Sequence, residues 1–141
     1  MRRLQILSVI AVAVTVGACS SSPPAPTETT TSAPYSQTDL VVGAGAQAVV
    51  GSRVTVNYTG WLHDSTKPDA KGRQFDSGQA VPFSIGVGAV IVGWDRGVPG
   101  MRVGGQRRLV IPPDLAYGSA GRGTIPPNAT LVFDITLIAV Q

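Results

Sequence analysis

The sequence predicts an α+β domain in which a twisted antiparallel sheet of about five strands wraps around one short helix. Two observations predict this class. From residue 37 onward, short runs rich in β-branched and aromatic residues alternate with glycine and proline, and the chain contains 17 glycines and 11 prolines. A helix is expected only once, over about two turns between residues 90 and 98. A sheet and a single short helix must pack against each other to bury a core.

Five strands are expected within this domain. In the second, Val54, Val56 and Tyr58 alternate with polar residues, which is typical of a half-buried antiparallel strand. The last strand has large apolar residues at every second position. The strands are expected over residues 39–42, 54–59, a short piece around Phe83, 107–111 and 130–140.

The helix is bounded by its own sequence. Pro99 and Gly100 end it, and Gly93 and Gly97 weaken it, so it cannot exceed about two turns. Trp94 lies near its start, where burial of the indole would anchor the helix to the sheet. Residues 63–73 are expected to form a loop.

Length and composition limit the possible functions. A chain of 141 residues suffices for one domain with short accessory segments. The net charge is +3, and Arg2 and Arg3 supply two of these charges, so a basic nucleic-acid-binding face is not expected. Cys19 is the one cysteine and His63 the one histidine, too few for a structural zinc site. We therefore expect no nucleic-acid partner and no metal.

The N-terminal residues have the layout of a secretory signal. Arg2 and Arg3 precede an uncharged, largely apolar run over residues 4–16. As a helix this run would be about 20 Å long, which is shorter than the roughly 30 Å hydrocarbon core of a bilayer. The sequence therefore favours export over a permanent membrane span.

The end of this segment resembles the lipobox of bacterial lipoproteins. Small residues precede Cys19 in the string Val-Gly-Ala-Cys over residues 16–19. The resemblance implies that Cys19 is lipidated and becomes the new N-terminus. The alternative is an ordinary signal peptide that contains a cysteine. With lipidation, residues 1–19 are a lipoprotein signal, and the protein is anchored to the outer side of a bacterial membrane, in the cell envelope.

Residues 20–36 are predicted to be a tether. They are rich in serine and threonine, contain four prolines, and have almost nothing to bury. Such a segment would reach on the order of 25 to 50 Å. The folded domain is expected over residues 37–141.

Five strings in this domain, taken in order, resemble the FKBP-type peptidyl-prolyl cis/trans isomerases. The likeness runs from about Gly51 to the C-terminus. The strings are VNYTG at 56–60, FDS at 75–77, VIVGWD at 90–95, PDLAYG at 113–118 and IPPNATLVFD at 125–134.

The resemblance implies an enzyme that rotates peptide bonds before proline, with no cofactor, metal or covalent intermediate. Its partners would be proline-containing exported polypeptides, with the macrolide ligands of the family as further ligands, and the protein is expected to be a monomer. The alternative is a module that binds proline-containing peptides, or a chaperone, with incidental isomerase activity.

The resemblance also implies a proline pocket between the helix and the sheet. Trp94 would form its floor, Asp76 its edge, and Tyr117 would offer a hydroxyl to a ligand carbonyl. The backbone N–H of Ile91 would donate to another carbonyl. Arg122 would stand at the opening, and either Val81 or Phe83 would complete a wall. The remaining residues implied to form the pocket are Tyr58, Phe75, Val90, Ile125 and Phe133.

The residues themselves leave a simpler interpretation open. Trp94, Phe133 and Tyr58 could all belong to an ordinary filled core. Asp76 precedes a serine and a glycine, a good turn sequence. However, many large apolar residues gather around one short helix, with an aspartate and a tyrosine at the edge, and this favours a concave ligand site.

Overall fold

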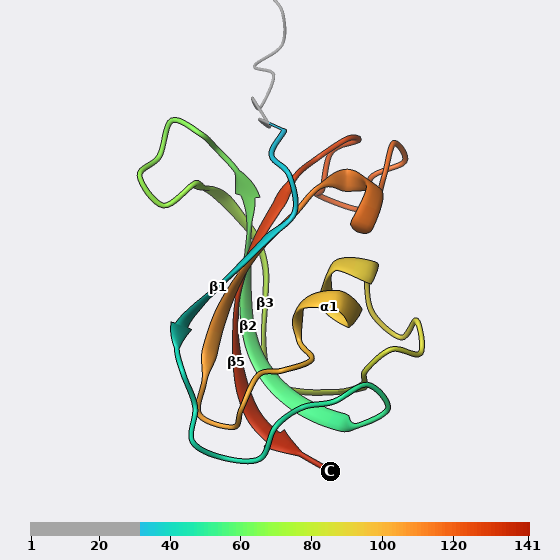
Figure 1. Cartoon of the computed structure of the whole chain (residues 1–141). Helices are drawn as coiled ribbons and strands as arrows, with labels where there is room; N and C mark the ends of the chain where they lie inside the picture. The colour runs from blue at the N-terminus through green and yellow to red at the C-terminus, as the bar shows by residue number, and fades with distance from the viewer. Residues whose placement is uncertain (1–31) are drawn as a thin grey trace, which may run out of the picture.

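The computed structural model describes residues 32–141, which form one five-stranded antiparallel sheet curved around a short helix (Figure 1). The strand order is β1-β4-β5-β2-β3. The predicted fold class is confirmed. The elements are β1 (Ser36–Val41), β2 (Arg53–His63), β3 (Lys71–Ser84), α1 (Val92–Gly97), β4 (Gln106–Ile111), the 3-10 turn Pro113–Leu115 and β5 (Leu131–Val140).

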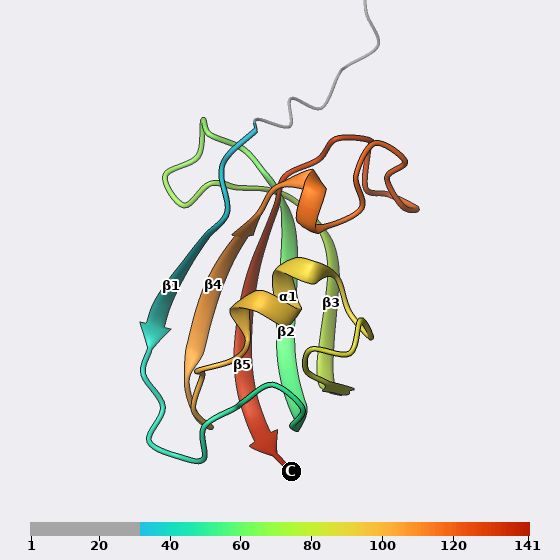
Figure 2. The ribbon, with the colours of Figure 1, turned by 45° about the vertical axis from the view of Figure 1, so that its right-hand side comes forward.

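The central strands β2 and β5 follow the predicted alternation. Val54 and Val56 on β2 are at most 1% exposed, and they pair with β5 and β3 on either side. On β5 the inward face carries Leu131, Phe133, Ile135 and Leu137, none more than 3% exposed. This inner face forms the core beneath α1, as Figure 2 shows.

The two glycines that weaken the helix let it approach the sheet. A β-carbon at Gly93 would lie 2.5 Å from the side chain of Ile111, and one at Gly97 would lie 2.6 Å from that of Leu109. Both neighbours are fully buried on β4. Packing against β4 therefore requires glycine at both positions, because a larger side chain would push the helix off the sheet. The same two glycines also limit the length of the helix.

Strand β3 is the largest departure from the expected elements. A short strand around Phe83 was expected, but β3 spans 14 residues and begins at Lys71. The predicted loop over residues 63–73 is confined to the residues between β2 and β3. Strand β3 is an edge strand in which half of the residues are exposed and only Phe83 is buried, so its sequence carries little apolar alternation.

The domain begins before residue 37. Tyr35 packs against the core, with the Arg96 guanidinium 5.7 Å from the centre of its ring. Ser36 opposes Val110 in the register of β1 with β4. The last residues assigned to the tether therefore belong to the folded domain. The predicted signal and lipidated Cys19 lie outside the described residues.

The chain enters and leaves the domain at opposite ends. In Figure 1 the N-terminal segment enters beside the loops that follow β4, and the C-terminus lies at the far end of the sheet. The Ala33 N–H lies 3.4 Å from Thr130 Oγ1, which ties the entering chain to the start of β5. Within residues 32–141, no helix has the length and apolar character needed to cross a membrane.

A cluster of charges lies on the sheet face opposite to the helix. Asp134 on β5 is 9% exposed and accepts hydrogen bonds from Lys71 Nζ at 2.7 Å and from Arg108 Nε and Nη2 at 2.7 and 3.0 Å. Burial alone would raise the pKa of Asp134, but the hydrogen bonds and charges of Arg108 and Lys71 lower it below its ordinary value. This cluster joins β3, β4 and β5.

Candidate functional site

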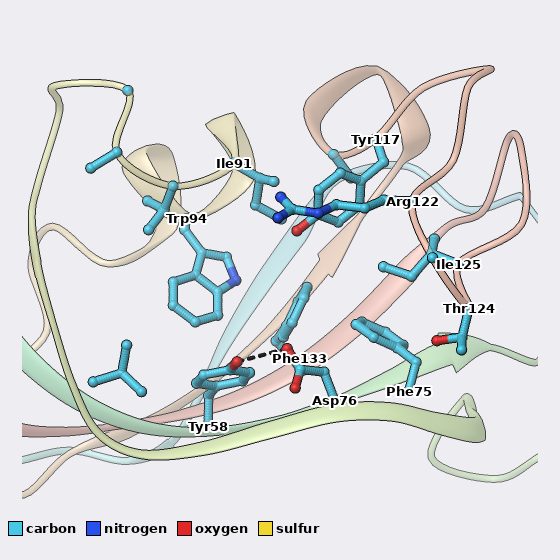
Figure 3. Close-up of a pocket in the computed structure, with 16 residues that line it drawn as sticks. Tyr58, Phe75, Asp76, Ile91, Trp94, Tyr117, Arg122, Thr124, Ile125 and Phe133 are labelled. Atoms are coloured by element: carbon cyan, nitrogen blue, oxygen red, sulfur yellow. Dashed lines mark hydrogen bonds between the residues drawn. The ribbon is translucent and has the colours of Figure 1, made fainter.

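A hollow of about 650 Å³ lies between the helix, the inner face of the sheet and the loop after β4 (Figure 3). Its volume falls in the usual range for small-molecule and peptide pockets. The nine residues implied as the main pocket all line it, together with Val81 and Arg122. The lining residues are Tyr58, Phe75, Asp76, Val81, Gly88, Ala89, Val90, Ile91, Trp94, Ala116, Tyr117, Arg122, Gly123, Thr124, Ile125 and Phe133.

Trp94 forms the floor within a cluster of aromatic rings. Its ring meets those of Tyr58 and Phe133 edge to face, with ring centres 4.9 and 5.3 Å apart. The Phe83 ring lies 5.5 Å from Trp94 but does not line the hollow. Of the two alternatives for this wall, the structure therefore places Val81 in the pocket and Phe83 in the core.

The indole N–H of Trp94 is an unusual feature of this floor. Trp94 is 6% exposed, and its Nε1 has no hydrogen-bond partner within residues 32–141. In Figure 3 the nitrogen edge of the indole faces the interior of the pocket. A buried donor without an acceptor costs free energy, so an occupant that carries an acceptor group is favoured.

A glycine on β2 makes room for two of the pocket walls. Gly60 lies opposite Phe133 on β5, and a β-carbon there would lie 2.7 Å from Phe75 and 2.8 Å from Phe133. Without that carbon the two phenylalanine rings meet edge to face with their centres 5.5 Å apart. The absence of a side chain at Gly60, the glycine of the VNYTG string, therefore lets Phe75 and Phe133 form adjoining walls of the pocket.

Asp76 positions Tyr58 and also stabilises its own turn. The Tyr58 hydroxyl donates to Asp76 Oδ2 at 2.7 Å, and the Ser77 N–H donates to Asp76 Oδ1 at 2.8 Å. Burial, followed by the hydrogen bond to Asp76 and its negative charge, raises the pKa of Tyr58 to about 12. The turn interpretation and the pocket-edge interpretation of Asp76 therefore both hold.

We expect Asp76→Asn to lower the pKa of Tyr58 toward the ordinary tyrosine value near 10, because the variant removes the adjacent negative charge. Since the pKa of Tyr58 is raised on folding, its contribution to stability is complete below about pH 10 and is lost as pH rises through about 12. Phenolate absorbance measured against pH checks the shift, with Tyr58→Phe identifying the signal. An unchanged titration in Asp76→Asn would contradict the assignment.

The helix holds the rim of the pocket on one side. Asp95 on α1 accepts the N–H of Gly86 at 2.9 Å and that of Gly88 at 3.1 Å. Both glycines have positive φ, near 79° and 73°, a conformation that glycine adopts without steric cost. This turn leads directly into Val90 and Ile91, so the helix that supplies the floor also fixes the rim.

The opposite side of the opening is formed by residues 116–125, here called the pocket lip. Arg122 and Ile125 exchange backbone hydrogen bonds of 3.0 and 2.8 Å, which close a tight turn. Arg73 on β3 donates to the Thr124 carbonyl at 2.9 Å and joins this turn to the sheet. Ala116 and Thr124 line the pocket without having been expected from the sequence, because neither is large, aromatic or charged.

Two further donors stand at the edge of the pocket. The N–H of Ile91 and the hydroxyl of Tyr117 make no hydrogen bond with other residues of the described range. Together with the Trp94 N–H, they give an apolar, aromatic hollow with three donors for carbonyl oxygens. Nowhere in residues 32–141 do three His, Cys, Asp or Glu side chains gather into a group that could hold a metal ion.

Comparisons with known proteins agree with this architecture. A family model described as FKBP-type peptidyl-prolyl cis-trans isomerase matches residues 45–138. An FK506-binding protein of Neisseria meningitidis serogroup A is 48% identical over 103 residues, which cover 72% of this chain and 92% of that protein.

Solved structures agree as well. The crystal structure of a peptidyl-prolyl cis-trans isomerase from Pseudomonas syringae is 40% identical and matches with a TM-score of 0.64, covering 76% of this chain and 75% of that one. The crystal structure of AtFKBP13 is 41% identical, has the same TM-score, and is covered over 93% of its length. The chain therefore belongs to the FKBP-type peptidyl-prolyl cis-trans isomerase family, as the five ordered strings predict.

Proposed function

We propose that this protein catalyses cis/trans isomerisation of peptide bonds before proline, with the proline ring held in the pocket above Trp94. The observation that supports this most directly is the combination of aromatic walls with three unpaired donors, from Trp94, Ile91 and Tyr117. Apolar walls suit the proline ring, and the donors suit the carbonyl oxygens on either side of it. Macrolide ligands of the family would occupy the same space.

The proposed mechanism requires only a pocket that fits the proline ring, excludes water and supplies hydrogen-bond donors. Rotation about a peptide bond passes through a twisted state that has lost resonance, at a barrier of about 18 to 20 kcal/mol. The twisted carbonyl has less charge separation than the planar amide, so a water-poor pocket favours the twisted state. Donors placed for the twisted geometry bind it more strongly than the planar one. A reduction of about 5 to 7 kcal/mol would accelerate exchange by roughly four to five decades.

The test is exchange spectroscopy by NMR on the purified full chain in detergent. The substrate is a tetrapeptide, Ala-Leu-Pro-Phe, with capped, uncharged ends. Uncatalysed exchange takes tens to hundreds of seconds, so acceleration is easily seen. We expect acceleration that a family macrolide abolishes. No acceleration over buffer overturns the proposal, and binding without acceleration would support the alternative of a peptide-binding module.

We further propose that the protein acts at the outer side of a bacterial membrane, on exported polypeptides as they fold. The supporting features are the signal layout and the lipobox-like string that ends at Cys19. Mass spectrometry of the N-terminus of the protein purified from its native membrane tests this. The expected species begins at a lipid-modified Cys19, and an unmodified N-terminus or an uncleaved signal would overturn the anchoring.

A further inference from the structure

Arg122 stands at the mouth of the pocket on a rigid support. Its backbone N–H and C=O are both bonded to Ile125, at 3.0 and 2.8 Å, and the turn that follows is joined to β3 through Arg73 and Thr124. Its side chain lines the pocket beside Tyr117, as Figure 3 shows. The backbone of this exposed arginine is therefore held beside the opening, and its guanidinium reaches over the Tyr117 ring.

This charge has no acidic partner among residues 32–141. The one interaction of the Arg122 guanidinium is with the face of the Tyr117 ring, 5.7 Å from its centre. Asp76, the carboxylate that lines the pocket, already accepts hydrogen bonds from Tyr58 and Ser77 on its two oxygens. The pocket lining therefore carries one positive charge, on Arg122, which makes no ion pair among residues 32–141, and one negative charge, on Asp76, whose two oxygens are already hydrogen-bonded.

We propose that Arg122 is a specificity-determining residue that makes the pocket prefer an acidic side chain over its neutral amide immediately before the proline. The inference rests on the proposed function. With the proline ring on the floor at Trp94, the preceding residue is joined directly to the rotating bond. In this proposal its side chain lies at the opening, beside Arg122 of the pocket lip. A carboxylate there would pair with the guanidinium.

The test compares peptides Ala-Xaa-Pro-Phe in which Xaa is Glu, Gln or Lys. Both ends are capped, so that any charge on the peptide is on the side chain of Xaa. The measured quantity is the ratio of kcat/KM between peptides for the same protein. We expect the Glu peptide to exceed the Gln peptide by about two- to fivefold, the range of a solvent-accessible ion pair. The ratio should fall as salt is added, and the Lys peptide should be the poorest.

Variants separate the charge from the packing of this side chain. Arg122→Gln should bring the Glu-to-Gln ratio close to one, and Arg122→Lys should restore most of it. Arg96 provides a matched control, because its guanidinium also lies 5.7 Å from a ring, that of Tyr35, outside the pocket. Arg96→Gln should leave the ratio unchanged.

The experiment distinguishes failure of the role of Arg122 from failure of the isomerase proposal. If no peptide is accelerated, the isomerase proposal fails. If all peptides are accelerated but the Glu-to-Gln ratio is one in the parent protein, the role of Arg122 is overturned while the isomerase proposal stands. The role is also overturned if the ratio survives Arg122→Gln, or if a preference appears only when the acidic residue follows the proline.

Discussion

Phe133→Ala is expected to destabilise the domain by about 3 to 5 kcal/mol and to lower kcat/KM for a proline peptide at least tenfold. Phe133 is 3% exposed and contacts Trp94 and Phe75 edge to face, so truncation leaves a cavity in the core. The same ring is a wall of the pocket. A loss of about 1.4 kcal/mol of transition-state binding already gives the tenfold effect.

Phe83→Ala is the matched control for this variant. Phe83 is also buried and lies at a similar distance from Trp94, with ring centres 5.5 Å apart, but it does not line the pocket. Denaturant unfolding should give a comparable loss of stability for both variants. At a temperature where both remain folded, only Phe133→Ala should show the large kinetic defect. Equal kinetic defects would mean that Phe133 acts through the core alone.

Asp134→Asn is expected to lower the free energy of unfolding by about 2 to 3 kcal/mol. The variant leaves the cations of Lys71 and Arg108 beside a neutral amide on a largely buried part of the sheet. Hydrogen bonds to charged groups, and ion pairs with a buried member, cost more to break than exposed pairs do. Urea unfolding monitored by tryptophan fluorescence measures the effect.

The comparison for Asp134 is Asp39→Asn. The carboxylate of Asp39 is 45% exposed, and its partner Arg107 also donates to the carbonyls of Gly97 and Pro99, so Arg107 remains satisfied. We expect a cost of less than about 1 kcal/mol there. An equally small cost for Asp134→Asn would show that solvent screens the cluster.

The Asp134 cluster also predicts a dependence on pH. An unfolded aspartate titrates near 3.9, and the pKa of Asp134 in the folded protein is lower. Its contribution to stability is therefore complete above about pH 4 and is lost as pH falls through the folded value. Wild type should lose stability in this acid range more steeply than Asp134→Asn.

The elements that could be predicted from the sequence are those with a buried face. Strand β5 alternates apolar and polar residues because one face meets the helix, and Gly93 and Gly97 marked a short helix before their packing role was visible. Strand β3 could not be bounded, because an edge strand with exposed side chains has no such pattern. Likewise, no sequence pattern near Asp134 indicates that it pairs with Lys71, which is 63 positions away.

The main pocket residues could be predicted from the five sequence strings, but the contribution of β3 and of the small lining residues could not. The five strings brought together Tyr58, Trp94 and Phe133, whereas the choice between Val81 and Phe83 depended on the exact register of β3 with β2. Bulges in that pairing shift the register, and no local signal in the sequence locates them. Small lining residues such as Ala116 carry no signal of their own.

The separation of the two chain ends has a practical consequence for labelling. The N-terminal segment enters beside the loops around the pocket lip, whereas Gln141 projects from the far end of the sheet (Figure 1). A fluorescent protein or affinity tag fused after Gln141 would stand away from a bound peptide. The same fusion placed just before residue 32 would stand at the end of the sheet where the loops after β4 lie, so tracking and capture reagents belong on the C-terminal side.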